Sequence, residues 1–231
     1  MNNKFENAYN QVEQTCPPIW IMRQAGRYQE GYMAMKENWT FEQMCKLPRI
    51  AAQVAMLPIN QFDFDIAILF SDILFPIEGL GVPLKFDPGP KFEWHINEEN
   101  YKDHSNIELA VKHMEFQARA VTATREALPA KKSLIGFVGG PWTLLNYAVG
   151  KDAKVSLGWK TKYMNEVIMP LLSRNIHLQL DAGAEKVMIL DSGVGNMSES
   201  YFKKHYVNTL QPLIQTDTGY YTQHLNSRCL P

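Results

Sequence analysis

The stretch "LIGFVGGPWTLLNY", residues 134–147, places an apolar run directly before a Gly-Gly-Pro turn and a second apolar segment. The surrounding residues 133–150 carry no charge over 18 positions, which is the lower limit for a membrane span. Gly139, Gly140 and Pro141 would break a spanning helix at its middle. We therefore expect a buried strand, a turn and a helix, and no membrane segment.

Three further apolar runs stop abruptly at polar or glycine-rich residues: "IWIM" (19–22), "DIAILF" (65–70) and "KVMIL" (186–190). Short continuous apolar runs with such ends are typical of fully buried parallel strands. Together with residues 134–139 they predict four strands of one sheet.

Two helices are predicted between these strands. Residues 106–128 carry apolar side chains at near-helical spacing, and Ser105 with Glu108 forms a capping box at the start. A second helix is expected over residues 161–182, interrupted or kinked at Pro170. Strands alternating with helices predict an α/β fold, in which functional side chains follow the carboxyl ends of the strands.

The composition is that of an ordinary globular protein. The chain has 231 residues, 45% of them hydrophobic, and its 23 basic and 24 acidic side chains leave a net charge of −1. We expect one domain, with no general attraction to nucleic acid or to an anionic membrane. The three cysteines show no zinc-ligand spacing, and no signal or transit peptide is evident, which indicates reduced thiols in the cytoplasm.

Arg23 and Arg27 stand where the first apolar run ends. If they shared a helical face, their like charges would repel by about 0.2–0.5 kcal/mol, so a compensating anion is expected. Either a protein carboxylate such as Glu30 or a ligand carboxylate or phosphate would satisfy a guanidinium. Asp72, which follows the second run, is either a helix N-cap or a site carboxylate.

Two further polar groups also have alternative interpretations. The N–H groups of "GGPW" (139–142) form either a simple turn or an anion-binding nest at the start of a helix, with Tyr147 a turn or more beyond. Ser192 either caps a helix or donates to a ligand.

Taken in order, "PPIWIMRQAGRY" (17–28), "ILFSDIL" (68–74), "IGFVGGPWT" (135–143) and "LDSGVGN" (190–196) closely resemble the uroporphyrinogen decarboxylases of haem biosynthesis. The resemblance runs from Phe5 to about Leu210. It implies a homodimeric (β/α)₈ barrel that uses no metal or organic cofactor. It also implies an enzyme that removes the four acetate carboxyl groups of uroporphyrinogen to give coproporphyrinogen.

The resemblance also assigns roles to residues. Arg23 and Asp72 are implied to be catalytic, the aspartate lying beneath the centre of the substrate. The implied substrate-binding residues are Arg23, Gln24, Ala25, Gly26, Arg27, Asp72, Tyr147 and Ser192. A substrate with eight carboxylates around four pyrrole N–H groups needs cations at its rim and an anion at its centre.

The sequence departs from the family pattern in length. Only the first four of the eight barrel strands can be placed, and residues 215–231 match nothing expected, so residues 1–231 are interpreted as one domain that is incomplete at the C-terminus. The implied alternatives are a decarboxylase completed by a separate C-terminal half, or an inactive relic that only binds a porphyrinogen or another polycarboxylate. The related zinc-dependent corrinoid methyltransferases are disfavoured, because His224 and Cys229 do not form a zinc-ligand pattern.

Overall fold

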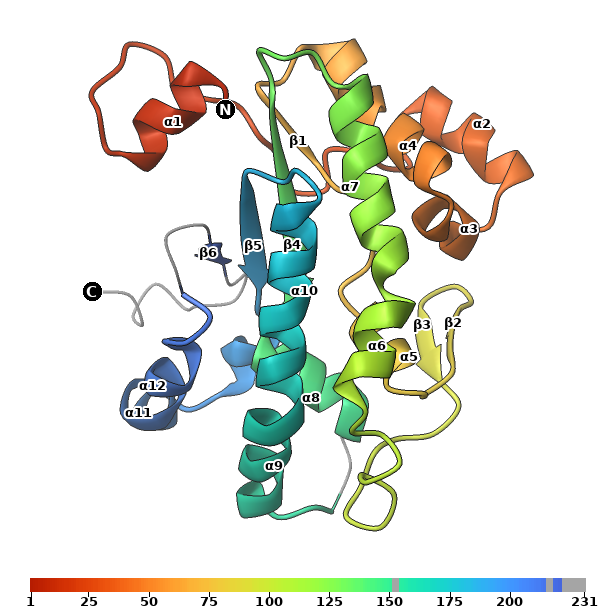
Figure 1. Cartoon of the computed structure of the whole chain (residues 1–231), viewed down its shortest axis with the longest axis vertical. Coiled ribbons are helices and arrows are strands. Elements are labelled where there is room, and N and C mark those ends of the chain that lie inside the picture. The colour runs from red at the N-terminus through yellow and green to blue at the C-terminus, as the bar shows by residue number, and fades with distance from the viewer. Residues whose placement is uncertain (151–153, 215–217, 222–231) are drawn as a thin grey trace. The chain divides into compact units, whose positions relative to one another are not determined.

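The computed structural model describes residues 1–150, 154–214 and 218–221. The chain divides into two compact units. Unit 1 comprises residues 1–72, 115–136 and 178–187, and unit 2 comprises residues 73–114, 137–177 and 188–231. Each unit is therefore assembled from segments that are distant in the sequence, as the colours of Figure 1 show.

The strands are β1 (Ile66–Ile68), β2 (Leu84–Phe86), β3 (Pro90–Phe92), β4 (Ser133–Gly139), β5 (Lys186–Leu190) and β6 (Thr218–Tyr221). The helices are α1 (Asn3–Tyr9), α2 (Glu30–Asn38), α3 (Phe41–Lys46), α4 (Pro48–Phe62), α5 (Phe75–Gly79), α6 (Ile107–His113), α7 (Glu115–Ala127), α8 (Pro141–Val149), α9 (Leu157–Tyr163), η1 (Met164–Ile168), α10 (Met169–Asp181), η2 (Ser192–Asn196), α11 (Glu199–Tyr201), η3 (Phe202–Tyr206) and α12 (Val207–Leu210).

The main sheet has the strand order β1-β4-β5-β6. Strands β1 and β4 are parallel, with Ile66 opposite Ser133 and Ile68 opposite Ile135. Every residue of β4 is buried, as its uninterrupted apolar sequence predicts. Three of the four predicted strands are confirmed as β1, β4 and β5.

The first predicted strand is wrong. Residues 19–22 form no strand, and Ile19 and Ile21 are exposed. The segment is tied to the start of β1 through Asp65, whose backbone N–H donates to the Ile19 carbonyl (3.1 Å) and whose carboxylate accepts from the Ile19 N–H (3.0 Å). A side-chain acceptor takes the place of one of the two backbone bonds here, so no regular ladder forms.

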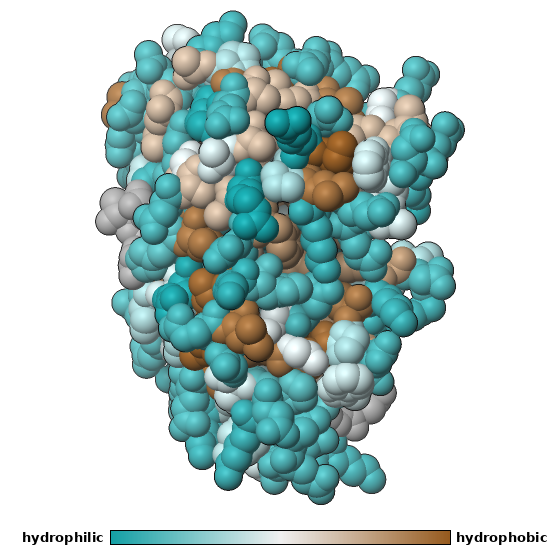
Figure 2. All heavy atoms as spheres, turned by 45° about the vertical axis from the view of Figure 1, so that its right-hand side comes forward, coloured by the Kyte–Doolittle hydropathy of each residue, from teal (hydrophilic) through white to brown (hydrophobic). Residues whose placement is uncertain are grey.

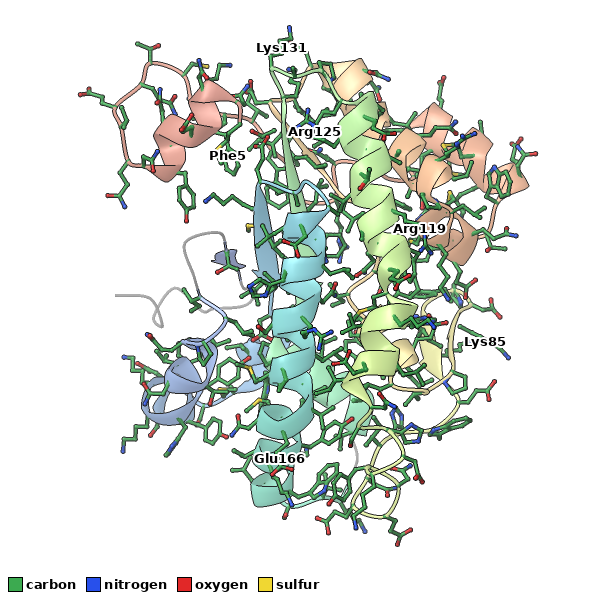
Figure 3. All side chains as sticks on the ribbon, viewed as in Figure 1. Phe5, Lys85, Arg119, Arg125, Lys131 and Glu166 are labelled. Carbon is green, nitrogen blue, oxygen red and sulfur yellow. The ribbon has the colours of Figure 1, made fainter. Side chains whose placement is uncertain are left out.

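In unit 1, α4 packs on α7 and on α3, and α2, α3 and α4 lie together beside α7 (Figure 1). Arg125 projects from α7, where Figure 3 labels it, and joins three segments. Its guanidinium donates to the carbonyls of Leu128 and Lys132 (both 3.1 Å) and to the carboxylate of Glu185 (3.3 Å). This side chain therefore holds the starts of β4 and β5 in place beneath the helix.

The predicted helix over residues 106–128 is present, but it consists of α6 and α7, which meet at Met114. Its predicted capping box is wrong. The N-cap is Asn106, whose side chain accepts from the N–H of Leu109 (3.0 Å), while the hydroxyl of Ser105 donates to the Tyr101 carbonyl. Asn, like Ser, is a favoured N-cap residue, so the one-residue shift costs little.

The second predicted helix is interrupted as expected. Helix α9 passes into a π-helical turn, η1, immediately before Pro170 and α10. A proline here removes one i→i−4 hydrogen bond, and a wider turn accommodates its ring. The chain then leaves α10 through Gly183, whose φ of 111° suits glycine.

The surface in Figure 2 is mostly hydrophilic, with hydrophobic residues in patches between the polar side chains. Among the described residues, no helix is long and apolar enough to cross a membrane. The segment 133–150 is instead divided between β4 and α8, as the Gly-Gly-Pro turn predicts.

Candidate functional site

In unit 1, residues 22–29 form a sequence of turns between the exposed apolar segment and α2. Arg23 adopts φ of 61°, a left-handed backbone conformation that costs a non-glycine residue roughly 1–2 kcal/mol. Gln24 compensates this cost. Its buried side-chain amide accepts from the Ile21 N–H (3.3 Å) and donates to the Ile66 carbonyl (3.0 Å), which ties the turn to β1.

The residues between the two arginines use their groups inside the protein. Ala25 packs against the buried cluster of Tyr32, Met44 and Val54. The N–H of Gly26 donates to the side-chain oxygen of Gln29 (3.2 Å). Gln24, Ala25 and Gly26 therefore hold the loop in shape, and the side chains of Arg23 and Arg27 are exposed on it.

Arg23 and Arg27 are both exposed and do not lie on a helix, so the condition for helical charge repulsion is not met. Within the described residues, neither guanidinium forms an ion pair or a side-chain hydrogen bond, with Glu30 or with any other carboxylate. Of the two interpretations, pairing with a protein carboxylate such as Glu30 is therefore not found among the described residues. Two guanidiniums without a partner in this part of the chain remain available to an external anion.

Asp72, which is half-buried, lies near the same part of unit 1. Burial raises the pKa of the Cys45 thiol well above its usual value, and the Asp72 carboxylate raises this pKa further. Burial also raises the pKa of Tyr32, with a smaller rise from Cys45 and an opposing effect of Arg27. Asp72 therefore acts electrostatically on the Cys45 thiol and Arg27 acts on the Tyr32 hydroxyl, and these two groups also act on each other. Burial and Asp72 together keep the Cys45 thiol neutral.

The route of the chain explains this proximity. Phe70 stands at the end of the β1 segment and packs on the same cluster as Ala25, with its ring 6.0 Å from that of Tyr32. One small core thus anchors both the arginine loop and the residue two positions before Asp72.

The N-cap interpretation of Asp72 is wrong, because α5 begins at Phe75 with Leu74 as its N-cap. The preceding residue, Ser71, accepts a hydrogen bond from the amide of Gln117 on α7 (2.9 Å). Gln117 is buried, and sequence reasoning missed it. Its signal was a polar residue on the apolar face of a predicted helix.

In unit 2, Tyr147 lies on α8 and is 38% exposed. Its backbone carbonyl accepts from Nδ1–H of His95 (3.2 Å), and its ring lies 6.4 Å from that of Phe92. The phenolic hydroxyl has no hydrogen-bond partner among the described residues. The β2–β3 hairpin and the segment after it, which sequence reasoning missed, thus support this tyrosine.

Ser192 opens the short 3₁₀ helix η2, whose N-cap is Asp191, so Ser192 is not the cap. Within the described part of the chain, its hydroxyl also has no partner. The anion-nest interpretation of "GGPW" is wrong. The N–H groups of Gly140 and Trp142 donate to the Leu190 carbonyl (2.8 Å) and to the Tyr206 hydroxyl (2.9 Å), respectively.

Known proteins of one family resemble the chain over most of its length. The sequence profile of uroporphyrinogen decarboxylase (URO-D) matches residues 1–222. The chain belongs to the uroporphyrinogen decarboxylase family. It is 35% identical over 228 residues to the uroporphyrinogen decarboxylase of Geobacter metallireducens and 34% identical to that of Trichlorobacter lovleyi, with 93% of this chain aligned in both cases. The chain spans 66% of the length of each of these relatives.

A methyltransferase from Methanosarcina mazei has the same fold, with a TM-score of 0.76 over 94% of this chain and 68% of that protein, at 16% identity. The fold class predicted from the sequence, α/β of the (β/α)₈-barrel type with part of the barrel present, is thereby confirmed. β6, which lies within the stretch that matched nothing expected from the sequence, is next to β5 in the strand order of the sheet.

Metal ligands are a separate question. Over residues 1–150, 154–214 and 218–221, no group of three or more His, Cys, Asp or Glu side chains is arranged to hold a metal ion. His224 and Cys229, the residues weighed for the zinc-dependent alternative, lie outside the described residues.

The influence of Asp72 on Cys45 can be measured without substrate. In a Cys16→Ser/Cys229→Ser background, we expect Asp72→Asn to lower the pKa of Cys45, because the removed carboxylate disfavours the thiolate. Cys45 should then react faster with iodoacetamide at a given pH, although burial keeps it slower than an exposed cysteine. The measurement is the labelling rate as a function of pH.

The matched control is Glu42→Gln, since Glu42 contributes a smaller rise than Asp72 to the same pKa. An unchanged pH profile in Asp72→Asn would show that Asp72 does not act on the thiol.

Proposed function

We propose that this chain acts on uroporphyrinogen in the cytoplasm, removing its four acetate carboxyl groups to give coproporphyrinogen. The observation that carries the proposal is the presence of two guanidiniums, Arg23 and Arg27, that have no partner among the described residues and lie in the same unit as the half-buried Asp72. Membership of the uroporphyrinogen decarboxylase family supports the choice of substrate.

The residue types fit the binding of this substrate. Its carboxylates match the guanidiniums of Arg23 and Arg27, which can each bind one carboxylate through two N–H groups. The hydroxyls of Tyr147 and Ser192 offer neutral hydrogen bonds to further carboxylates. Asp72 accepts hydrogen bonds from the pyrrole N–H groups at the centre.

The chemistry requires only a proton donor and a fixed anion. Direct loss of CO₂ from a pyrrole acetate would leave an unstabilised carbanion. Protonation of the ring carbon first makes a cation that accepts the electron pair of the breaking C–C bond. Loss of CO₂ leaves an exocyclic methylene, which takes up a proton to become a methyl group, and the ring carbon then loses the proton that it gained. Each acetate therefore takes up one proton and releases one CO₂ overall.

Asp72 stabilises the cationic ring in this scheme. At a separation of ~4 Å and an effective dielectric constant of ~20, a carboxylate stabilises a unit positive charge by about 4 kcal/mol. That energy corresponds to a rate increase on the order of a thousandfold. Arg23, from the rim, holds the substrate so that its reacting carbon stays in place.

A second candidate function is binding without turnover. The chain spans 66% of the length of its relatives, so groups that complete the reaction can reside outside it. Anaerobic incubation with uroporphyrinogen III, followed by chromatography of the oxidised products, separates the two functions. Formation of coproporphyrin supports the decarboxylase, and calorimetric binding without product supports the binding protein.

We expect Asp72→Asn to lower the decarboxylation rate by roughly a thousandfold while leaving uroporphyrinogen affinity within a few fold. The amide keeps the shape and polarity of the carboxylate but loses the charge that stabilises the cation. The readouts are the single-turnover rate and the calorimetric Kd. Turnover at the parental rate would exclude an electrostatic role of Asp72.

Replacement of Arg23 or Arg27 by Lys should weaken uroporphyrinogen binding by about tenfold, because an ammonium cannot make the two parallel hydrogen bonds of a guanidinium. Arg119→Lys is the control. This arginine is also exposed, and it pairs with Glu115 on the surface of α7, where Figure 3 labels it. Equal affinities in all three variants would remove the arginine loop from the binding site.

The family resemblance also implies self-association, and we propose that the chain assembles as a homodimer or with a separate chain that supplies the later strands. In unit 1, β1 ends the strand order, and Ile19, Ile21 and Phe62 are 46%, 52% and 44% exposed. Burying these side chains in an assembly is favourable.

We therefore expect the purified chain to sediment as an oligomer and to bind a hydrophobic dye, and Ile21→Ser/Phe62→Ser to reduce both signals. Leu109→Ser, at a position 59% exposed in unit 2, is the control. A monodisperse parental monomer that binds no dye would contradict the assembly proposal.

A further inference from the structure

Asp191 is a fully buried carboxylate at the end of β5 in unit 2. One of its oxygens, Oδ1, accepts from the backbone N–H of Thr143 (2.9 Å) and from the Thr143 hydroxyl (2.7 Å). The other oxygen, Oδ2, accepts from the hydroxyl of Tyr206. An anion buried away from water is thus held by three donors, two of them from the first turn of α8.

The hydroxyls of Tyr206 and Thr143 extend this network, because each also accepts a hydrogen bond from a backbone N–H. The Tyr206 hydroxyl accepts from the N–H of Trp142 (2.9 Å), and the Thr143 hydroxyl accepts from the N–H of Gly193 (2.8 Å). Each hydroxyl therefore accepts from a backbone N–H and donates to the carboxylate. Such chains of hydrogen bonds polarise one another.

The network surrounds Ser192. Its neighbour on one side, Asp191, and its neighbour on the other side, Gly193, are both bound to Thr143. Thr143 and Tyr147 lie one turn apart on α8, so they share a face of that helix. The position of Ser192 is thus fixed relative to the helix that carries Tyr147.

Position 140 has no space for a side chain next to the Asp191 carboxylate. A Cβ atom at Gly140 would lie 2.2 Å from Cβ and Cγ of Asp191, so a residue with a side chain there would displace the carboxylate. The carboxylate also occupies the positive end of α8, which would otherwise attract a ligand anion.

We propose that Asp191, Thr143 and Tyr206 are positioning residues that set Ser192 against α8, with Asp191 serving as an internal anion in place of a substrate carboxylate. The consequence for binding rests on the proposed function, in which Ser192 and Tyr147 contact substrate carboxylates. The positioning of Ser192 does not rest on the proposed function, because the hydrogen-bond network is present in the chain without a substrate.

The first test needs no substrate. In Asp191→Ala, the lost carboxylate leaves a space of its own size facing three donors. We expect hydrogen exchange of the amides of residues 192–196 to increase at least tenfold, and millimolar formate to restore the parental rate by taking the place of the carboxylate. Formate should have no effect on the parent.

Tyr163→Phe is the matched control. Tyr163 is another buried tyrosine of unit 2, and its hydroxyl donates to the His104 carbonyl (2.7 Å). This variant loses one buried tyrosine hydroxyl but should leave exchange at residues 192–196 unchanged. If Asp191→Ala does not fold, Tyr206→Phe and Thr143→Val each remove one hydroxyl and the two hydrogen bonds that it forms in the network, and each should raise the exchange rate at Gly193. Parental exchange in the variants that fold, or failure of formate to restore it in a folded Asp191→Ala, would overturn the proposal.

The second test measures affinity for uroporphyrinogen I by anaerobic calorimetry. Asp191→Asn and Ser192→Ala should each weaken binding on the order of tenfold, the value of about one hydrogen bond. The double variant should be no weaker than either single variant, because Asp191 acts through Ser192.

If the losses of binding free energy in the two single variants add up in the double variant, Asp191 does not act on binding through Ser192, and that part of the proposal is overturned. If the parent binds no uroporphyrinogen, the proposed function fails, and the exchange experiment still decides whether Asp191 positions Ser192.

Discussion

The buried carboxylate of Asp191 is the interaction on which the arrangement of unit 2 depends. The start of α8 exposes N–H groups that no helical carbonyl can satisfy, and the end of β5 must stop beside it. A single anion, supported by two hydroxyls, satisfies these donors and joins the two elements. The free energy of burying the charge is offset by three charge-assisted hydrogen bonds and by the favourable end of the helix.

In unit 1, the neutral side chain of Gln24 has the corresponding role of joining two segments. The amide of Gln24 bridges Ile21 and Ile66, which fixes a loop whose backbone at Arg23 is otherwise unfavourable. A neutral amide avoids placing a buried charge beside two arginines. In both units, one internal polar side chain forms hydrogen bonds inside the protein, Gln24 with backbone groups and Asp191 with one backbone N–H and two hydroxyls. The neighbouring residues Arg23 and Ser192 carry side-chain groups without a partner among the described residues.

The sequence predicts β4 and β5 well, because an uninterrupted apolar run between turn residues has few other interpretations in a parallel sheet. It fails at residues 19–22, where Ile19 and Ile21 are exposed and the segment pairs with an aspartate side chain as much as with backbone. The β2–β3 hairpin was missed because each strand has only three residues and little alternation. The boundaries of strands and helices depend on whether side chains or backbone groups form the local hydrogen bonds.

The candidate site residues were assigned roles only through the resemblance of the sequence to a family. From local pattern alone, Asp191 and Ser192 are equivalent candidates, and so are Gln24 and Arg27. Tertiary contacts distinguish them, since a polar group is available to a ligand only if no backbone donor or acceptor already occupies it.

Arg23 and Arg27 have no ion-pair partner among the described residues, so their contribution to binding depends on how they are held. A guanidinium that is exposed and hydrated loses little when it exchanges water for a carboxylate, so the gain must come from geometry fixed in advance. The left-handed conformation of Arg23, held by Gln24, supplies such geometry at a cost already met during folding. Cys45 adds no charge to this region because its thiol stays neutral, whereas the carboxylates of Asp72 and, more weakly, Glu42 act on it electrostatically. Under the proposed function, the exposed cations of Arg23 and Arg27 bind the anionic rim of the substrate, and the Asp72 carboxylate stabilises the centre that becomes cationic during reaction.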